Sequence, residues 1–256
     1  MLPFAADLLL ELGVRPVAVP SLRGRPPESW SGIDRVALDH SAGPNLEQLI
    51  AVEPDIVVTG VVYAQFVPAI ERMTGARVVT MEIDSIASIA EHTRTLGRLV
   101  DHPERAERLV ERRMASLDPP SLHSDPVRVL AVFGSPHAFY AVLPDSYLGD
   151  LVRRAGGELV TRELDDHPVY RGLAPLSMEA VMARDPEQLL VIFHGAEKTA
   201  RDMLERDPLW AGLTAVESGA VAYLADDLYT MRPGSELGRA AETIRRIIDD
   251  ARERRR

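Results

Sequence analysis

The residues best suited to bind a ligand are a histidine and a tyrosine that follow short apolar segments. His194 comes directly after the apolar run 189–193, and Tyr63 follows the similar run 56–60. Imidazole and phenolate groups are both axial ligands of haem iron in proteins. A histidine at the end of a strand can instead hydrogen-bond a backbone carbonyl, so structural and ligand-binding roles both stay open for His194.

Further candidates lie in segments that would connect strands to helices. They supply imidazole, phenol, thioether and guanidinium groups, and a guanidinium suits the carboxylate of a propionate or a siderophore. Aromatic and methionine side chains at such places can equally serve packing. These additional candidate ligand-binding residues are His40, His137, Tyr140, Tyr147, Met231 and Arg232.

The common signatures of catalysis are missing. The chain has no cysteine, which removes thiolate catalysis and cysteine-bound metals, and it has no glycine-rich nucleotide loop, nucleophile elbow or H-E-x-x-H motif. The run 165–167, Asp-Asp-His, is typical of a solvated turn. We therefore expect a binding protein; the alternative is a two-lobed α/β enzyme acting on a small acid, with Asp145 or His137 as general base.

Composition limits the partners. Of 256 residues, 46% are hydrophobic and 27% are charged, which is typical of a globular protein. The net charge of -10 would repel nucleic acid and anionic membrane surfaces, so no nucleic-acid partner is expected. The arginines in 252–256 fit the end of a last helix, where positive charge opposes the helix dipole.

An internal repeat organises the chain. The segment 44–60 recurs as 175–195: each copy has an Asn or Ser suited to cap a helix, then an acidic residue, Glu47 or Glu179. Seven residues after that acidic residue, a proline ends the helix before an apolar strand-like run. A repeated helix and strand of this kind indicates two similar halves.

Short apolar strands alternate with helices, which indicates an α/β fold of two Rossmann-like lobes with parallel sheets. We expect an N-terminal lobe over 1–84, a long helical connector over 85–120 that is split at Pro103, and a C-terminal lobe over 121–256. The first lobe is expected to lack its opening strand, and so to have one parallel strand fewer, because no strand precedes the helix that begins near Pro3.

Two such lobes would form a cleft. Ligands of open parallel sheets bind outside the carboxyl ends of the strands, so the candidate side chains are expected to gather there. A helical connector resists hinge bending, which predicts little motion between the lobes when a ligand binds.

Several motifs together resemble a known family. They are the segments 44–47 and 53–57, Ser-Tyr-Leu-Gly-Asp-Leu-Val at 146–152, and Ala-Gly-Gly at 155–157. In combination they are similar to the class III solute-binding proteins of ABC importers for siderophores, haem and cobalamin, above all to haem-binding lipoproteins of Gram-positive surface-determinant iron uptake. The resemblance implies a monomer outside the cytoplasm, its leader absent from this numbering, that takes up an iron chelate and delivers it to a membrane permease without a catalytic cofactor.

The resemblance also implies roles for particular residues. His194 corresponds to a histidine that binds haem iron opposite a methionine, but Ala42 stands where that methionine would fall. His40 or Tyr63 is then the alternative second ligand, or the cargo is a ferric siderophore or a cobamide.

Family members carry an acidic residue on each lobe that docks onto arginines of the permease. Glu47 and Glu179 are the pair that the repeat offers for this role. Both could instead favour the first turn of their helices through the helix dipole.

Overall fold

The computed structural model divides into two compact units. The first contains Met1–Glu82 and Ser88–Arg112, and the second contains Ile83–Ala87 and Arg113–Arg256. Most of the expected connector thus belongs to the first unit. The structure describes residues 1–22, 26–39, 42–121, 123–134, 139–168, 170–176, 178–193, 201–202, 206 and 208–255.

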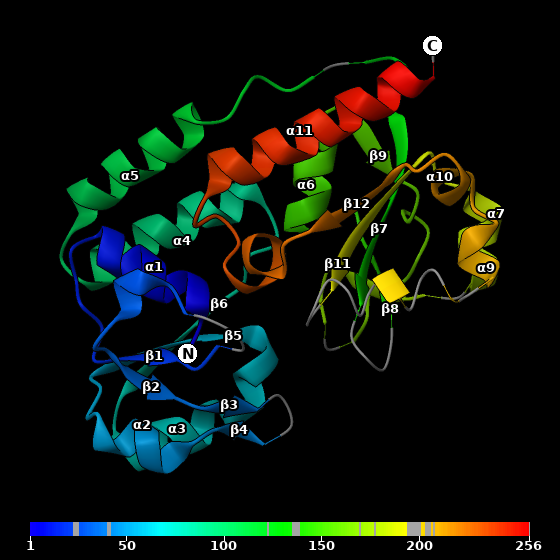
Figure 1. The fold of residues 1–256 in the computed structure, drawn as a ribbon. Helices are drawn as coiled ribbons and strands as arrows, with labels where there is room; N and C mark the ends of the chain where they lie inside the picture. Colours follow the sequence, from blue (N-terminus) through cyan, green and yellow to red (C-terminus); the bar gives the residue numbers. More distant parts are fainter. Residues whose placement is uncertain are drawn as a thin grey trace. The chain divides into compact units, whose positions relative to one another are not determined.

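In the residues described for the first unit, the strands form three separate pairs (Figure 1). Two pairs are parallel and the third is a short antiparallel hairpin. The parallel pairs are β1 (Ala18–Pro20) with β2 (Asp34–Val36) and β5 (Ile56–Gly60) with β6 (Arg77–Met81), and the hairpin joins β3 (Leu38–Asp39) to β4 (Gly43–Pro44).

Helices connect these strands. Their apolar side chains pack with the strands in two clusters, one around Leu49, Val57 and Ile70 and one around Val19 and Trp30. The helices are α1 (Pro3–Glu11), α2 (Leu46–Ala51) and α3 (Val67–Thr74), with 3-10 turns η1 (Glu28–Trp30) and η2 (Val61–Phe66).

Two helices follow β6, in place of one long connecting helix. They are α4 (Ile86–Leu99) and α5 (Pro103–Ala115), and the break lies where the sequence predicted it. Asp101 between them takes the left-handed conformation, with φ of 59°, and proline at the first position of α5 needs no backbone donor.

The second unit is built on a six-stranded sheet in which β7, β9, β11 and β12 run parallel. All six residues of the central strand β11 are buried, as expected where helices and loops cover both faces. The strands are β7 (Val127–Gly134), β8 (Phe139–Val142), β9 (Gly157–Leu159), β10 (Leu173–Pro175), β11 (Gln188–Phe193) and β12 (Val221–Leu224).

This sheet differs from the expected parallel sheet at one edge. β8 pairs antiparallel with β7, and β10 pairs antiparallel with β8. The helical segments are α6 (Tyr147–Arg154), α7 (Met178–Arg184), α9 (Pro208–Ala211), α10 (Thr214–Glu217), the π-helical turn η3 (Asp227–Met231) and α11 (Leu237–Arg254), which lies beside α6.

The basic end of α11 is paired with its own unit. Arg255 forms ion pairs with Glu187 and Asp125, which lie just before β11 and β7. The Glu187 carboxyl is partly buried, and these arginine contacts hold its pKa below the usual value despite that burial. The arginine run is thus part of the packing at the amino ends of the strands.

The repeat predicted from the sequence is present in the backbone. Helix α2 leads into β5 as α7 leads into β11, and Asn45 caps α2 by accepting a hydrogen bond from the Gln48 amide (3.0 Å). Glu53 and Asp185, each directly before a proline, both have positive φ, 44° and 34°. A non-glycine residue adopts this conformation rarely, so its presence at both matching positions supports the equivalence.

The sequence predicted one parallel strand fewer in the first unit than in the second, and this prediction is wrong. In the described residues each unit has four strands in parallel pairing: β1, β2, β5 and β6 in the first, and β7, β9, β11 and β12 in the second. The pairing differs instead. In the second unit β7 lies between β9 and β11. In the first unit, β1 and β5 correspond to β9 and β11, and within the described residues β1 pairs only with β2 and β5 only with β6. The α/β class is confirmed.

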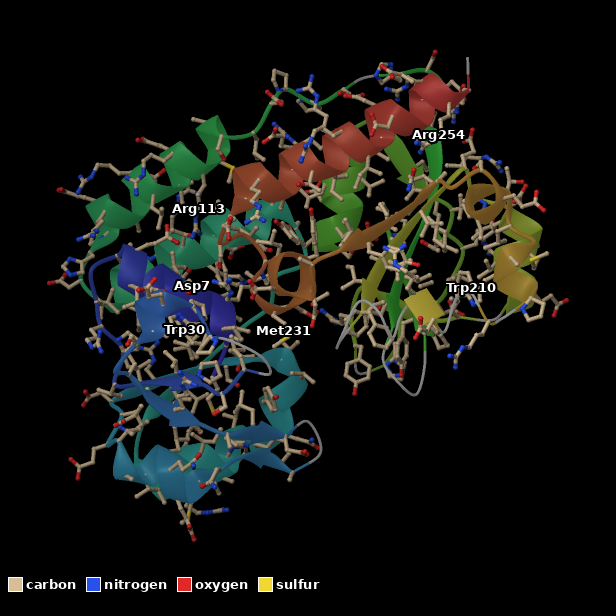
Figure 2. The ribbon with its side chains drawn as sticks, in the orientation of Figure 1. Asp7, Trp30, Arg113, Trp210, Met231 and Arg254 are labelled. Carbon is tan, nitrogen blue, oxygen red and sulfur yellow. The ribbon has the colours of Figure 1, made fainter. Side chains whose placement is uncertain are left out.

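A buried hydrogen bond in the first unit gives a test of this packing. The indole of Trp30, fully buried, donates to Asp7 Oδ1 (2.8 Å; Figure 2). We expect Asp7→Ala to lower the free energy of unfolding by about 1–3 kcal/mol, because it leaves a buried donor without its acceptor. Asp7→Asn keeps an acceptor oxygen and should cost less, and Asp34→Ala, at an exposed position of β2, is the control. Equal urea midpoints for Asp7→Ala and the parent would contradict this prediction.

Candidate functional site

Three neighbouring strands of the second unit end at one edge of the sheet. Gly134, the last residue of β7, lies opposite Phe193, the last of β11, and Ile192 lies opposite Leu224, the last of β12. The last residues of β7, β11 and β12 therefore lie at the same edge of the sheet. We call this edge, formed by Gly134, Phe193 and Leu224, the carboxyl edge. A ligand was expected from the sequence at this edge.

Two histidine candidates of this unit belong to segments that leave the carboxyl edge. His194 directly follows β11 in the sequence, and His137 falls between β7 and β8. Both lie outside the described residues. The described residues nearest to them in the sequence are Gly134, Phe139 and Phe193.

Aromatic rings pack beneath the carboxyl edge. The ring of Phe139 lies 6.4 Å from that of Phe193 and 5.9 Å from that of Trp210, which is 3% exposed. Glycine is required at position 134, because a Cβ there would lie 2.4 Å from the Phe139 ring. This packing fixes the positions of the last residues of β7 and β11.

A second aromatic cluster joins Tyr140 to two residues that the sequence analysis did not select. Tyr140 on β8 makes edge contacts with His167 and Tyr170, at ring centroid distances of 5.7 and 6.0 Å, and His167 stacks on Tyr170 at 4.9 Å. The Tyr170 backbone amide donates to His167 Nδ1 (3.1 Å), so the loop before β10 holds the stack. Antiparallel pairing of β8 with β10 brings this loop to Tyr140, and the repeat gave no sign of that pairing.

The segment after β12 carries Met231 and Arg232. Met231 ends the π-helical turn η3 and is partly buried (Figure 2). The Arg232 guanidinium binds both carboxylate oxygens of Asp227, with Nε at 2.6 Å from Oδ1, and its side chain is 13% exposed. A ligand carboxylate would therefore compete with Asp227 for Arg232.

Tyr147 lies in the interior at the start of α6. It is 3% exposed, and burial raises its pKa above the ordinary range of tyrosine. Tyr229 of η3 is also buried: its pKa is raised to about 12 by burial, and its hydroxyl donates to the Ala240 carbonyl (3.2 Å). Both phenols are therefore neutral at ordinary pH.

The first unit brings two other candidates into one region. Tyr63 lies on η2, directly after β5, and is 6% exposed with its ring 6.4 Å from that of Phe66. Gly43, at the base of the β3–β4 hairpin, packs on the Phe66 ring. His40 belongs to this hairpin connection but lies outside the described residues. Tyr63 therefore lies in the interior below the hairpin.

The acidic pair occupies matching positions. Glu47 and Glu179 are each exposed in the first turn of their helix, α2 or α7, ahead of β5 and β11. Neither is ion-paired to a basic side chain among the described contacts.

The enzyme alternative named two candidate bases, of which the structure describes one. Asp145 is exposed on the turn before α6, and His137, the other proposed base, lies outside the described residues. The acidic turn before β10 is structural, since Asp166 accepts a hydrogen bond from the Gly172 amide (2.8 Å). Over the described ranges, no group of three or more histidine, aspartate or glutamate side chains could hold a metal ion.

Cavities elsewhere in the second unit do not involve these candidates. One of about 530 Å³ lies beside α6 and β9, with His123, Arg153 and Arg162 in its wall. Another, of about 280 Å³, lies between α6 and α11. Among the described residues, none of the ligand-binding candidates from the sequence lines either cavity.

In the part of the chain that the structure describes, no helix is both long and apolar enough to cross a membrane.

Comparison with known proteins gives consistent matches. A Vitamin B12-binding protein from Salmonella choleraesuis is 27% identical over 219 residues, covering 84% of this chain and 77% of that protein. The Fe(3+)-citrate-binding protein YfmC of Bacillus subtilis is 27% identical over 78% of this chain and 62% of its own length. The fold matches that of S. aureus IsdE complexed with heme, with a TM-score of 0.82 at 18% identity over 96% of each chain.

A family model covers most of the chain. The model is described as Periplasmic binding protein, and it matches residues 3–228, which include both copies of the repeat and the carboxyl edge. The chain therefore belongs to the periplasmic binding protein family.

Proposed function

We propose that this protein is the solute-binding component of an ABC importer and that its cargo is an iron chelate, with haem favoured. In this proposal the protein binds its cargo without transforming it, and passes it to a permease in the membrane. It acts as a monomer outside the cytoplasm. Membership of the periplasmic binding protein family supports this class of function.

The observation that carries the proposal is the common carboxyl edge of β7, β11 and β12. Aromatic packing fixes the end of β11 at Phe193, and the next residue in the sequence is His194. A neutral imidazole at such an edge is suited to bind haem iron. In the proposed site His137, Tyr140, Met231 and Arg232 contact the cargo.

For the second iron ligand we propose His40 or Tyr63. These residues belong to neighbouring segments of the first unit, the β3–β4 hairpin connection and η2. The Tyr63 side chain is 6% exposed, so it would need to turn outward to reach a ligand. His40 and Tyr63 are both proposed for this role.

A ferric siderophore or a cobamide is the second candidate cargo. Two relatives, each 27% identical to this chain, are named for vitamin B12 and for ferric citrate. Such cargo arrives with its metal already coordinated, so His194 would not be an iron ligand. Arg232, released from Asp227, and the ring faces of Tyr140 and Tyr170 would then hold the chelate.

The test for haem is a spectroscopic titration. We expect the parent protein to shift the Soret band of added haem, and His194→Ala to change that band and weaken binding by at least about tenfold, equivalent to roughly 1.4 kcal/mol. Binding by the parent should weaken as pH falls through the range where histidine takes up a proton, since only neutral imidazole binds iron.

A matched control is His102→Ala, at an exposed position between α4 and α5. It should leave the spectrum unchanged. An unchanged spectrum and affinity for His194→Ala would exclude His194 as a ligand. If the parent does not perturb haem but its tryptophan fluorescence is quenched by ferric citrate or cyanocobalamin, the second candidate replaces haem.

Permease docking is proposed for Glu47 and Glu179. Both are exposed, and they hold matching places in the two copies of the repeat. We expect Glu47→Gln with Glu179→Gln to reduce stimulation of the permease ATPase in proteoliposomes by about tenfold or more, because two charge pairs with arginines are lost. Ligand affinity of the free protein should not change.

The matched control for docking is Glu71→Gln with Glu217→Gln, an exposed acidic pair on α3 and α10. It removes the same charge from other parts of the two units. Equal losses for the two double variants would show a general effect of net charge and contradict a docking role.

A further inference from the structure

Two exposed apolar side chains hold matching places in the two copies of the repeat. Ile50 on α2 is 38% exposed, and Met182 on α7 is 41% exposed. Each follows the glutamate of its helix, Glu47 or Glu179, by three residues. Three residues further on, the backbone takes positive φ directly before a proline in both copies, so the two places are in register. A single exposed apolar residue needs no explanation, but its recurrence at equivalent places indicates a shared use.

The apolar residue and the glutamate share one face of each helix. Side chains three and four positions apart are neighbours on a helix surface. A small exposed residue follows the apolar one directly and lies on the same face. We call these the outer faces, and their exposed residues are Glu47, Ile50 and Ala51 on α2 and Glu179, Met182 and Ala183 on α7. Each outer face therefore combines a carboxylate with apolar surface.

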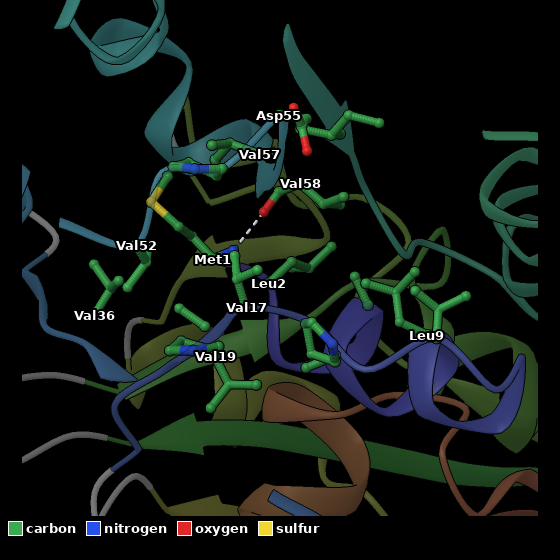
Figure 3. A pocket seen from close by; sticks show the side chains of 18 of the residues that line it. Met1, Leu2, Leu9, Val17, Val19, Val36, Val52, Asp55, Val57 and Val58 are labelled. Carbon is green, nitrogen blue, oxygen red and sulfur yellow. Dashed lines mark hydrogen bonds between the residues drawn. The ribbon is translucent and has the colours of Figure 1, made fainter. Parts of the chain in front are cut away.

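The opposite face of each helix packs into its own unit. Leu49 is buried and, with Val52, lines a cavity of about 230 Å³ within the first unit (Figure 3). Val181, the residue of α7 that matches Leu49, is buried in a cluster with Leu130 and Leu189. These inward contacts fix the rotation of each helix about its axis, and they leave the outer faces in contact with solvent.

The amide and guanidinium side chains of these two helices already have partners. Gln48 Oε1 accepts a hydrogen bond from the Ala37 amide (2.8 Å). Arg184, the basic residue of α7, donates from Nε to the Val160 carbonyl (2.8 Å) and from Nη1 to the Ala180 carbonyl (2.9 Å). Helix α2 contains no basic residue. The carboxylate of each outer face is therefore left to a basic group from outside its helix.

The outer faces are suited to a partner surface that is both basic and apolar. A charge pair between exposed groups contributes little to binding, because water and salt screen it. Apolar side chains around such a pair exclude water when two surfaces meet, and this strengthens the charge pair. Ile50 and Met182 have the position and the exposure to do this for Glu47 and Glu179.

We propose that Ile50 and Met182 contact the permease directly, and that the permease presents an arginine flanked by apolar side chains to each outer face. This inference rests on the docking role proposed above for Glu47 and Glu179, and it adds the chemistry of the partner surface. The glutamates select a basic partner, and the apolar residues keep it bound, since buried contacts mainly slow dissociation.

The test compares double variants in proteoliposomes that contain the permease. Ile50→Ser with Met182→Ser should raise the protein concentration needed for half-maximal ATPase stimulation at least about tenfold, because both apolar contacts are lost. Ile50→Leu with Met182→Leu keeps apolar side chains and should stay within about threefold of the parent. The loss caused by the serine pair should persist at high salt, whereas the loss caused by Glu47→Gln with Glu179→Gln should shrink, since salt already screens the charge pairs.

The matched control is Val17→Ser, which removes an apolar side chain that is 57% exposed from the residue before β1. It should leave stimulation unchanged. All of these variants should keep the Tm and the cargo affinity of the parent, because the substituted side chains are exposed.

A second readout follows from the absence of cysteine in the chain, which allows one dye to be attached at a single chosen position. An environment-sensitive dye on Ile50→Cys or on Met182→Cys should shift its emission to the blue when the permease is added, because the contact excludes water. The same dye on Val17→Cys should not shift.

Three results would overturn the inference. If the serine pair keeps the half-maximal concentration of the parent while the glutamine pair loses stimulation, the apolar contacts are wrong and the docking role of the glutamates stands. An equal loss for Val17→Ser would show a general effect of exposed apolar surface. If neither double variant changes stimulation, this inference and the docking role of Glu47 and Glu179 both fail.

Discussion

Burial of β11 on both faces is the constraint on which the second unit depends. A strand buried on both sides must satisfy every backbone group through its neighbours, so β7 and β12 are held in parallel register along it. That register brings the three strand ends to one level. His194, the best ligand candidate, is the next residue in the sequence after β11.

The parts predicted correctly from the sequence have strong local signals. Pro103 in the helical region predicted the break between α4 and α5. The repeated spacing of an acidic residue and a proline predicted that α2 leads into β5 and α7 into β11. The β8–β10 pairing was missed because antiparallel partners at a sheet edge depend on contacts between distant residues, which carry no spacing signal. The contacts of Tyr140 with His167 and Tyr170 were missed for the same reason, because this pairing brings their loop to Tyr140.

Side-chain burial was also hard to foresee. Tyr63 and Tyr147 follow strands or begin helices, as ligand-binding residues often do, but both rings are buried. Tyrosine is amphipathic, so its place in a sequence does not tell whether the hydroxyl points to solvent or to the interior. Arg232 shows the same difficulty, since its pairing with Asp227 depends on the π-helical turn that brings the two residues together.

The ion pairs of Arg255 determine on which side of the second unit the carboxyl end of the chain lies. They hold the end of α11 beside Glu187 and Asp125, just before β11 and β7 begin. Six residues of extended strand separate that side from the carboxyl edge, a span of about 20 Å. A fluorophore or a surface anchor attached after α11 would sit on the side of this unit away from the carboxyl edge, so the protein can be immobilised as a sensor without covering that edge.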